Sequence, residues 1–513
     1  MKSDNPLHWS NIDHKHRKLI MAGLMLGMLA ACLDGTIVST CGTIIAEDLG
    51  GLGLYAWMFT AFMLAETITI PIGGKLSDLY GRKPFFLLGM GLFAGGSVIA
   101  GLSVNMEMFI ICRAIQGVGG GFLMPVATAA IADLYSPTER GKMQGIMGAI
   151  FGLGTALGPV IGGFIADSIS WHWVFYINIP LAAVALFLCA RKFPSLEVSN
   201  TKRIDFLGMS VLGLFLLDLL LFFTWAGKDF DWISYESGIM VGVAAMLLIV
   251  FVFLEFRAED PVIAPRLFKN RTFVGGAFSM MIFGLALTGS MTYMSMFSIF
   301  VMGLSVREAG YLTIALVAGL MITASMSGKF VEKTGSRPWL IAGPIISFAG
   351  MVLMSTLGLG DSVWLLALYM FILGIGLGCV MAVLMVAVQN SAKADEMGMT
   401  TSSVNLFRAI GATVATGVFA FIINLRLDDE LAAELPAEVY AILPHDTDVL
   451  GYIAFMPQYA TQILNSFADS VDFAFLLGGI IILLMLVAVP FVKNHNSTDD
   501  MEEAKEIKVE DES

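Results

Sequence analysis

Three ionisable residues, Asp34, Glu66 and Arg113, lie within long apolar stretches of the chain. Apolar residues flank each of them for several helical turns, so a charge there is costly unless it is paired, hydrated or neutralised. A carboxyl group kept away from water holds its proton more firmly, which brings protonation into the working pH range. These residues therefore indicate reversible proton binding at Asp34 and Glu66, with Arg113 favouring release of the proton.

Two polar residues, Gln116 and Arg408, are expected to support these charges. Gln116 follows Arg113 at a spacing of three and Gly117 follows at four, which places all three on one face of a helix. Arg408 interrupts another apolar stretch, near one of its ends. The alternative interpretation is a permanent buried pair that only orders the helices, and the residue types alone leave both interpretations open.

The composition determines the class of protein. Of 513 residues, 57% are hydrophobic and only 14% are charged, which is too apolar for soluble domains of ordinary size. We therefore predict an all-α integral membrane protein, because apolar segments of about 20 residues recur along the chain. The fourteen predicted spans cover residues 19–44, 54–74, 85–104, 106–130, 142–166, 172–190, 205–226, 236–255, 272–302, 309–327, 338–357, 362–388, 400–424 and 471–492.

The positive charges predict the orientation of these spans. Loops on the cytoplasmic side of a membrane collect lysine and arginine. With the N-terminus inside, the expected outer loops hold only Lys228, Arg307 and Arg426, and two further arginines lie within spans, so the other 24 of the 29 basic residues are on the inner side. We expect a multi-pass protein of the cell membrane with both termini cytoplasmic.

The first span contains Leu29-Ala30-Ala31-Cys32, which reads like a lipoprotein cleavage box. Cleavage there would remove most of the span and invert the charge pattern, and the apolar helix is too long for a signal peptide. We therefore expect the span to be retained. The five cysteines show no paired spacing and the six histidines lie in tails and loops, so we expect no metal and no cofactor.

The chain contains an internal repeat. GKLSDLYGRKP at 74–84 matches GKFVEKTGSRP at 328–338, with a constant offset of 254 residues. A second pair, Glu139 and Gly141 against Glu396 and Gly398, repeats at 257. Two matches at nearly equal offsets predict two six-helix bundles related by pseudo-twofold symmetry, with two inserted central helices.

The predicted organisation is a cytoplasmic segment 1–18, a bundle 19–192, linkers and inserted helices 193–271, a bundle 272–492 with an acidic external loop 425–470, and an acidic cytoplasmic tail 493–513.

Several motifs resemble those of one transporter family, the fourteen-helix drug:proton antiporters of the major facilitator superfamily. LDGTIV at 33–38, GGKLSDLYGRKP at 73–84, CRAIQGVGGG at 112–121 and GAIFGLGTALGPVIGG at 148–163 follow the order of the family's motifs. WHWVFYINIP at 171–180 also fits, although this chain has His172 where the family usually has arginine. The resemblance covers nearly the whole chain and does not identify the substrate.

The loop that follows the second span has the composition of a contact between the bundles that can hold in one state and release in the other, which we call the latch. Its glycines permit a tight turn and close helix packing, its acid can meet a helix N-terminus, and its basic residues face lipid headgroups. The resemblance implies that Asp78 and Arg82 stabilise an outward-facing state; a loop that only sets orientation is the simpler alternative. The candidate gating residues are Gly74, Asp78, Gly81, Arg82 and Lys83.

The span 142–166 carries glycines four residues apart, which allow two membrane helices to pack backbone to backbone. Close packing alone would explain them, whereas the full motif resembles that of exchangers, in which this helix seals the interface against leak. The residues of this antiporter motif are Gly154, Gly158, Pro159, Gly162 and Gly163.

A pocket for varied lipophilic compounds would be apolar and adaptable. MTYMSMFSIF at 291–300 offers flexible methionine and aromatic side chains, so Tyr293 and Phe297 are candidate pocket residues. The simpler interpretation is a stripe that packs against helices or lipid.

The resemblance implies export of amphipathic, cationic drugs or toxic compounds in exchange for protons, by alternating access. The alternative on the same scaffold is an exporter or proton-coupled carrier of a metabolite such as an amino acid or siderophore. The sequence has no nucleotide-binding loop, metal cluster or nucleophile with a base, so it does not indicate an enzyme. The expected partners are a small-molecule substrate, protons and the lipid bilayer, with no nucleic acid, and we expect a monomer.

Overall fold

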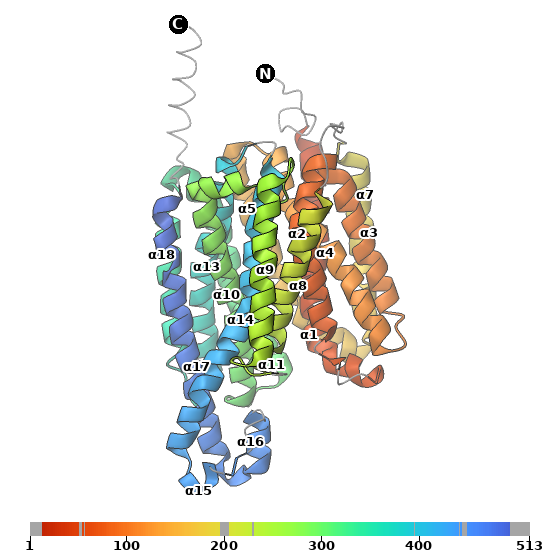
Figure 1. Cartoon of the computed structure of the whole chain (residues 1–513). Helices are drawn as coiled ribbons and strands as arrows, with labels where there is room; N and C mark the ends of the chain where they lie inside the picture. Colours follow the sequence, from red (N-terminus) through yellow and green to blue (C-terminus); the bar gives the residue numbers. More distant parts are fainter. Residues whose placement is uncertain are drawn as a thin grey trace.

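The computed structural model describes residues 13–492 except 51–53, 56, 195–204, 228–229, 394–395, 441 and 444–448. The described residues are almost entirely helical, and long helices run side by side through the molecule (Figure 1). The acidic tail 493–513 and most of the predicted cytoplasmic segment 1–18 lie outside the described residues.

Three groups of helices follow one another along the chain. The N-terminal bundle contains α1 (His14–Asp48), α2 (Trp57–Tyr80), α3 (Arg82–Ala100), α4 (Met106–Leu134), α5 (Pro137–Ser168), α6 (His172–Tyr176) and α7 (Asn178–Lys192). The inserted pair is α8 (Phe206–Trp225) and α9 (Tyr235–Arg257), and the short helix η2 (Pro265–Lys269) links it to the second bundle. The C-terminal bundle contains α10 (Arg271–Phe300), α11 (Val306–Thr334), α12 (Arg337–Met354), α13 (Val363–Ser391), α14 (Met397–Glu434), α15 (Ala437–Tyr440), α16 (Val449–Phe455), η4 (Pro457–Tyr459), α17 (Ala460–Leu483), α18 (Met485–Ala488) and η5 (Val489–Phe491).

Twelve spans within the described residues are long and apolar enough to cross a membrane, counting α6 with α7 and α17 with α18 as one span each. Helices α2 and α5 run alongside them through the same layer (Figure 1). Together they make fourteen spanning helices, which confirms the predicted number and fold class.

Helix α1 begins and α18 ends at the same end of the bundle, the upper end in Figure 1. We call this end the termini side and the opposite end, which carries α15 and α16, the far side. Helix α14 continues ten residues beyond its predicted end at 424, and α17 begins at Ala460 rather than 471. The predicted limits are wrong there because Ile423, Leu427, Leu431 and Leu435 extend one buried apolar face past the membrane-length window.

The repeated motifs meet across the boundary between the bundles. Gly74 of α2 packs against Gly398 and Ser402 of α14, and the equivalent Gly328 of α11 packs against Gly141 of α5. Each copy of the first motif therefore contacts the second motif of the other bundle, as pseudo-twofold symmetry requires. The turn glycines that follow are also equivalent: Gly81 and Gly335 have φ values of 94° and 75°, where a side chain would strain the backbone.

The inserted helices cover one side of the boundary between the two bundles. Helix α8 contacts α2 and α14, which belong to different bundles, and α9 packs against α8 (Figure 1). A small apolar cluster joins them, in which Met209, Leu212 and Leu216 of α8 meet Ile70 of α2 and Leu406 of α14.

Within the N-terminal bundle, small residues on α4 bring its neighbours close. A methyl group at Gly117 would collide with the carbonyl oxygen of Phe62 on α2, and one at Gly119 would lie 2.5 Å from the backbone nitrogen of Phe93 on α3. This backbone-to-backbone packing fixes α2 and α3 against the polar face of α4.

We predict that Gly117→Leu destabilises the protein by about 1–3 kcal/mol, since α2 must move away from α4 to admit the side chain. The matched control is Gly95→Leu on α3, where no atom of the described residues lies within 4 Å of the added Cβ atom. Thermal unfolding in detergent should show a lower Tm for the first variant only. Equal Tm values for the two variants would contradict the packing argument.

Candidate functional site

The carboxylate of Asp34 lies fully buried in the middle of α1 and is surrounded by donors. Arg113 of α4 forms an ion pair with it through Nη1. Gln116 donates from Nε2 to Oδ1 at 3.1 Å, and Asn178 at the start of α7 donates from Nδ2 to the same oxygen at 2.9 Å. The predicted proximity of Asp34 to Arg113 and Gln116 is therefore present in the structure.

The partners of Asp34 are themselves held in place. Arg113 donates from Nε to the backbone oxygen of Met58 at 3.3 Å, and its guanidinium lies 4.3 Å from the centre of the Phe62 ring. Ser97 of α3 accepts hydrogen bonds from Gln116 at 2.7 Å and from Asn178 at 3.3 Å. The network thus joins five helices of one bundle, α1, α2, α3, α4 and α7, around a single acid.

Asn178 and Ser97 were not among the residues predicted from the sequence. Asn178 lies in the quoted segment WHWVFYINIP, where a lone amide among apolar residues was a usable signal. Ser97 lies in GGSVIA and gave no comparable signal, because small hydroxyl residues are common in membrane helices and bond to their own backbone, as Ser97 does with Phe93.

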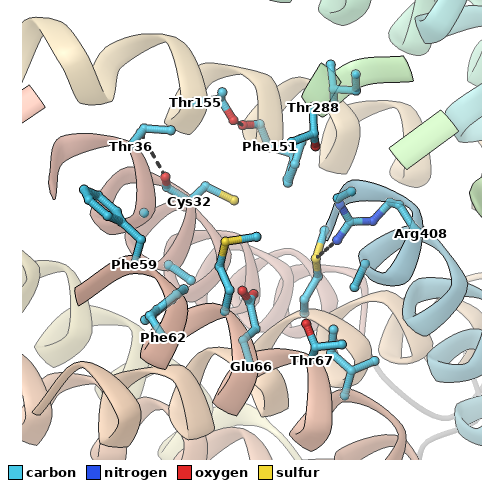
Figure 2. Close-up of a pocket in the computed structure, with 18 of the residues that line it drawn as sticks. Cys32, Thr36, Phe59, Phe62, Glu66, Thr67, Phe151, Thr155, Thr288 and Arg408 are labelled. Atoms are coloured by element: carbon cyan, nitrogen blue, oxygen red, sulfur yellow. Dashed lines mark hydrogen bonds between the residues drawn. The ribbon is translucent and has the colours of Figure 1, made fainter. Parts of the chain in front are cut away.

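A cavity of about 400 Å³ lies between the two bundles, beside this network. Helices α1, α2, α4 and α5 form its wall on one side, and α10 and α14 form the other. Figure 2 shows Glu66 and Arg408 pointing into the cavity from opposite bundles. Arg113 borders the cavity as well, and so connects it with Asp34. The apolar lining consists of Met28, Ala31, Phe59, Phe62, Met63, Ile70, Met124, Phe151, Leu287, Met291, Ala409 and Ala412.

The two cavity charges differ from Asp34 in their surroundings. Arg408 donates from Nη2 to the sulfur of Met124 at 3.1 Å and lies 5.4 Å from the centre of the Phe151 ring. Its Nε has no hydrogen-bond partner in the part of the chain that the structure describes. Within the described residues neither Glu66 nor Arg408 forms an ion pair. Arg408, predicted near a helix end as polar support, is instead a wall residue of the cavity.

The candidate latch lies at the termini side. Asp78 accepts hydrogen bonds from the backbone nitrogens of Gly398 at 2.9 Å and Met399 at 2.6 Å, at the N-terminus of α14. Arg82 forms ion pairs with Asp78 at 2.5 Å and with Asp133 of α4 at 2.9 Å. Lys83 beside it is half-buried. The carboxylate of one bundle thus caps a helix of the other, where the helix dipole favours a negative charge.

Further contacts between the bundles separate the cavity from the termini side. Gln389 of α13 accepts from Gln144 of α5 at 3.1 Å and donates to the backbone oxygen of Thr128 at 3.0 Å. Closer to the termini side, Arg140 donates to Asn390 at 3.0 Å. The cavity is therefore closed toward the termini side by successive layers of polar contacts.

Comparison with known proteins identifies the family of this chain. A sequence profile of the Major Facilitator Superfamily matches residues 24–416. The chain belongs to this superfamily. It is 34% identical to the multidrug transporter protein MdtP of Bacillus subtilis (strain 168), over 96% of this chain and 97% of that protein, and 34% identical to multidrug resistance protein 3 of the same organism, over 93% and 95%. The structure of the proton:xylose symporter XylE has the same fold, with a TM-score of 0.62, 15% identity, and coverage of 94% of this chain and 97% of XylE. The protein is thus a multi-pass membrane transporter of the superfamily and not an enzyme.

In this superfamily member, the glycines of α5 serve two different interfaces. Gly154, Gly158 and Gly162 face Cys32, Thr36 and Ile37 of α1, inside the N-terminal bundle. Gly141, Gly145 and Gly152 lie against α11 of the other bundle. Pro159 and Gly163 are within α5, but their surroundings lie outside the described part of the structure. The antiporter motif therefore packs α5 on α1, and a separate glycine series approaches the other bundle.

The two predicted pocket residues lie in the core of the C-terminal bundle. The Tyr293 hydroxyl donates to the backbone oxygen of Thr416 at 2.7 Å and its ring stacks on Phe419, and Phe297 is fully buried. Met291 and Thr292 of the same segment line the cavity instead. The helical period thus turns Tyr293 and Phe297 toward the core, and their placement does not support contact with a substrate.

We predict that Asp78→Ala loosens the termini side, because it removes two charge-assisted hydrogen bonds to α14. Amide hydrogen exchange at Gly398 and Met399 should become faster by about tenfold or more, since such bonds contribute about 1.5–3 kcal/mol each. Asp133→Asn is the matched control, because it removes the other acid of Arg82 and leaves both bonds to α14. Unchanged exchange at the two amides in Asp78→Ala would rule out the latch.

Proposed function

We propose that this superfamily member is a proton-coupled antiporter of the fourteen-helix drug:proton branch, which exports amphipathic compounds by alternating access. The observation that carries the proposal is the buried network of Asp34, Arg113, Gln116 and Asn178, adjoining a cavity between two bundles. The similarity to two Bacillus proteins named for multidrug transport and resistance supports export of drug-like compounds.

The proposed orientation places the termini side in the cytoplasm of a bacterial cell, with the protein acting as a monomer in the cell membrane. The excess of lysine and arginine in the loops at that side supports this orientation. In the described state the cytoplasmic side is closed, by Asp78 at α14 and by the glutamines of α5 and α13. The cavity is then reached from the outer side, as in the state that the latch is proposed to stabilise.

Proton coupling follows from the chemistry of the network. A proton that enters from outside neutralises Asp34, and Arg113 and the two amides then lose their anionic acceptor. Because an unpaired guanidinium in a membrane interior is costly, Arg113 must find another acceptor, and α1 and α4 must shift relative to each other. This rearrangement favours opening of the cytoplasmic side, where the proton leaves and the substrate binds. The apolar cavity wall supplies a surface for the lipophilic body of the substrate.

We predict that Asp34→Asn abolishes efflux driven by a pH gradient, because an amide keeps the shape of the side chain and cannot carry the proton. Reconstituted vesicles with an imposed pH gradient should show at least about a tenfold loss of dye efflux, with an unchanged elution profile in detergent. Asp218→Asn is the matched control, since Asp218 is a membrane carboxylate on α8 that does not line the cavity. Unchanged efflux by Asp34→Asn would exclude the coupling role.

The coupling itself is tested in inverted membrane vesicles that hold an internal acid load. Addition of lipophilic amphiphiles should release protons from vesicles with the wild-type protein and should leave the Asp34→Asn vesicles silent. No response to any amphiphile, together with a response to an amino acid or a siderophore, would show a metabolite carrier on the same scaffold.

A further inference from the structure

Two opposite charges face the same cavity without pairing with each other. Glu66 of α2 and Arg408 of α14 both point into the space (Figure 2), and neither has an ion-pair partner among the described residues. The Asp34–Arg113 pair shows how two charges that satisfy each other are arranged in this protein: fully buried, in direct contact and enclosed by amides. Glu66 and Arg408 have none of these features.

The guanidinium of Arg408 makes little use of its N–H hydrogen-bond donors. A guanidinium has five N–H donors, and the described partner of Arg408 is a thioether sulfur, which is a weak acceptor. Its Nε is shielded from solvent and finds no hydrogen-bond partner among the residues that the structure describes. A buried donor without a partner costs free energy, and a charged one costs more. The arrangement is therefore suited to a ligand that brings a strong anionic acceptor.

We propose that the cavity recognises amphipathic zwitterions, with an acidic group of the substrate bound by Arg408 and its cationic group beside Glu66. This inference rests on the proposed function and names its substrate class. A compound with a positive charge only would bring that charge into a cavity that already contains a guanidinium and would leave Arg408 without an anionic acceptor, which opposes its binding. The purely cationic substrates implied by family resemblance are therefore the less suitable class for this chain.

The position of the two charges also gives the ligand a mechanical role. Glu66 belongs to the N-terminal bundle and Arg408 to the C-terminal bundle, so a zwitterion bound to both connects the two bodies that must move. The lining between them contains Phe62, Phe151 and Met291, which can contact an apolar body. A cavity of about 400 Å³ is in the size range of sites for drug-sized molecules.

The test uses two dyes that differ in one group: rhodamine B, which carries a xanthylium cation and a free carboxylate, and its ethyl ester, in which the carboxylate is esterified and only the cation remains. Binding to the full-length protein is measured in detergent by fluorescence polarisation, without a proton gradient. The wild-type protein should bind rhodamine B at least about tenfold more tightly than the ester, as expected for one charge-assisted hydrogen bond. A wild-type protein that prefers the ester would overturn the proposal.

Variants of Arg408 and Glu66 test which charged group of the dye each residue binds. Arg408→Gln should weaken rhodamine B binding by about tenfold or more and leave binding of the ester unchanged or tighter, whereas the matched variant Arg408→Lys keeps a charge and should retain part of the preference. Glu66→Gln should weaken the binding of both dyes. Equal losses for the two dyes in Arg408→Gln, with an unchanged Tm, would show that Arg408 only supports the structure and would overturn the proposal.

These outcomes are separable from the proposed function. Because dye binding needs no gradient, a dye preference that depends on Arg408 supports the zwitterion site even if vesicles show no proton exchange. Proton-driven efflux of both dyes with equal efficiency in wild type and Arg408→Gln would keep the antiport function and remove the zwitterion site.

Discussion

The ion pair between Asp34 and Arg113 is the interaction on which the N-terminal bundle depends. Two opposite charges in the interior of a membrane protein are tolerated only when their geometry is close and their remaining bonding positions are filled. Gln116 and Asn178 fill those of Asp34, and this requires α1, α4 and α7 to approach closely. This close approach requires glycine at Gly96. A methyl group there would lie 2.7 Å from the Gln116 side chain, so a larger residue would displace the amide from Asp34.

Helix α4 connects this ion pair with the rest of the transport path. Arg113 binds Asp34 and borders the cavity, Met124 accepts from Arg408 across the bundle boundary, and the backbone oxygen of Thr128 accepts from Gln389 in the closed side. These points span fifteen residues of one helix, or about 22 Å. A shift of α4 caused by a change at Asp34 would therefore reach the cavity wall and the closing contacts together, without any separate signalling element.

The features of the fold that depend on composition, residue spacing and internal repetition could be predicted from the sequence. Fourteen spans and two related bundles followed from apolar length and equal offsets, and the spacing of three residues placed Arg113 and Gln116 on one helix face as the polar partners expected for a buried acid. The position of Arg408 and the contributions of Ser97 and Asn178 did not follow, because they depend on how helices distant in the sequence rotate about their axes. The same reason explains Tyr293: its segment was identified, but one helical turn contains both core and cavity faces, and hydropathy does not distinguish them.

The structure also separates two carboxylates that the sequence treated as equivalent. Asp34 and Glu66 were both expected to bind a proton reversibly, yet Asp34 is enclosed by donors of its own bundle whereas Glu66 faces the cavity with Arg408 opposite. A ligand in the cavity can reach Glu66 without breaking the Asp34 network, so direct competition for one carboxylate is not required for coupling. Arg113 touches both environments, being paired with Asp34 and part of the cavity wall. In the proposed antiporter, the link between proton and substrate therefore runs through the guanidinium of Arg113 and the helix that carries it.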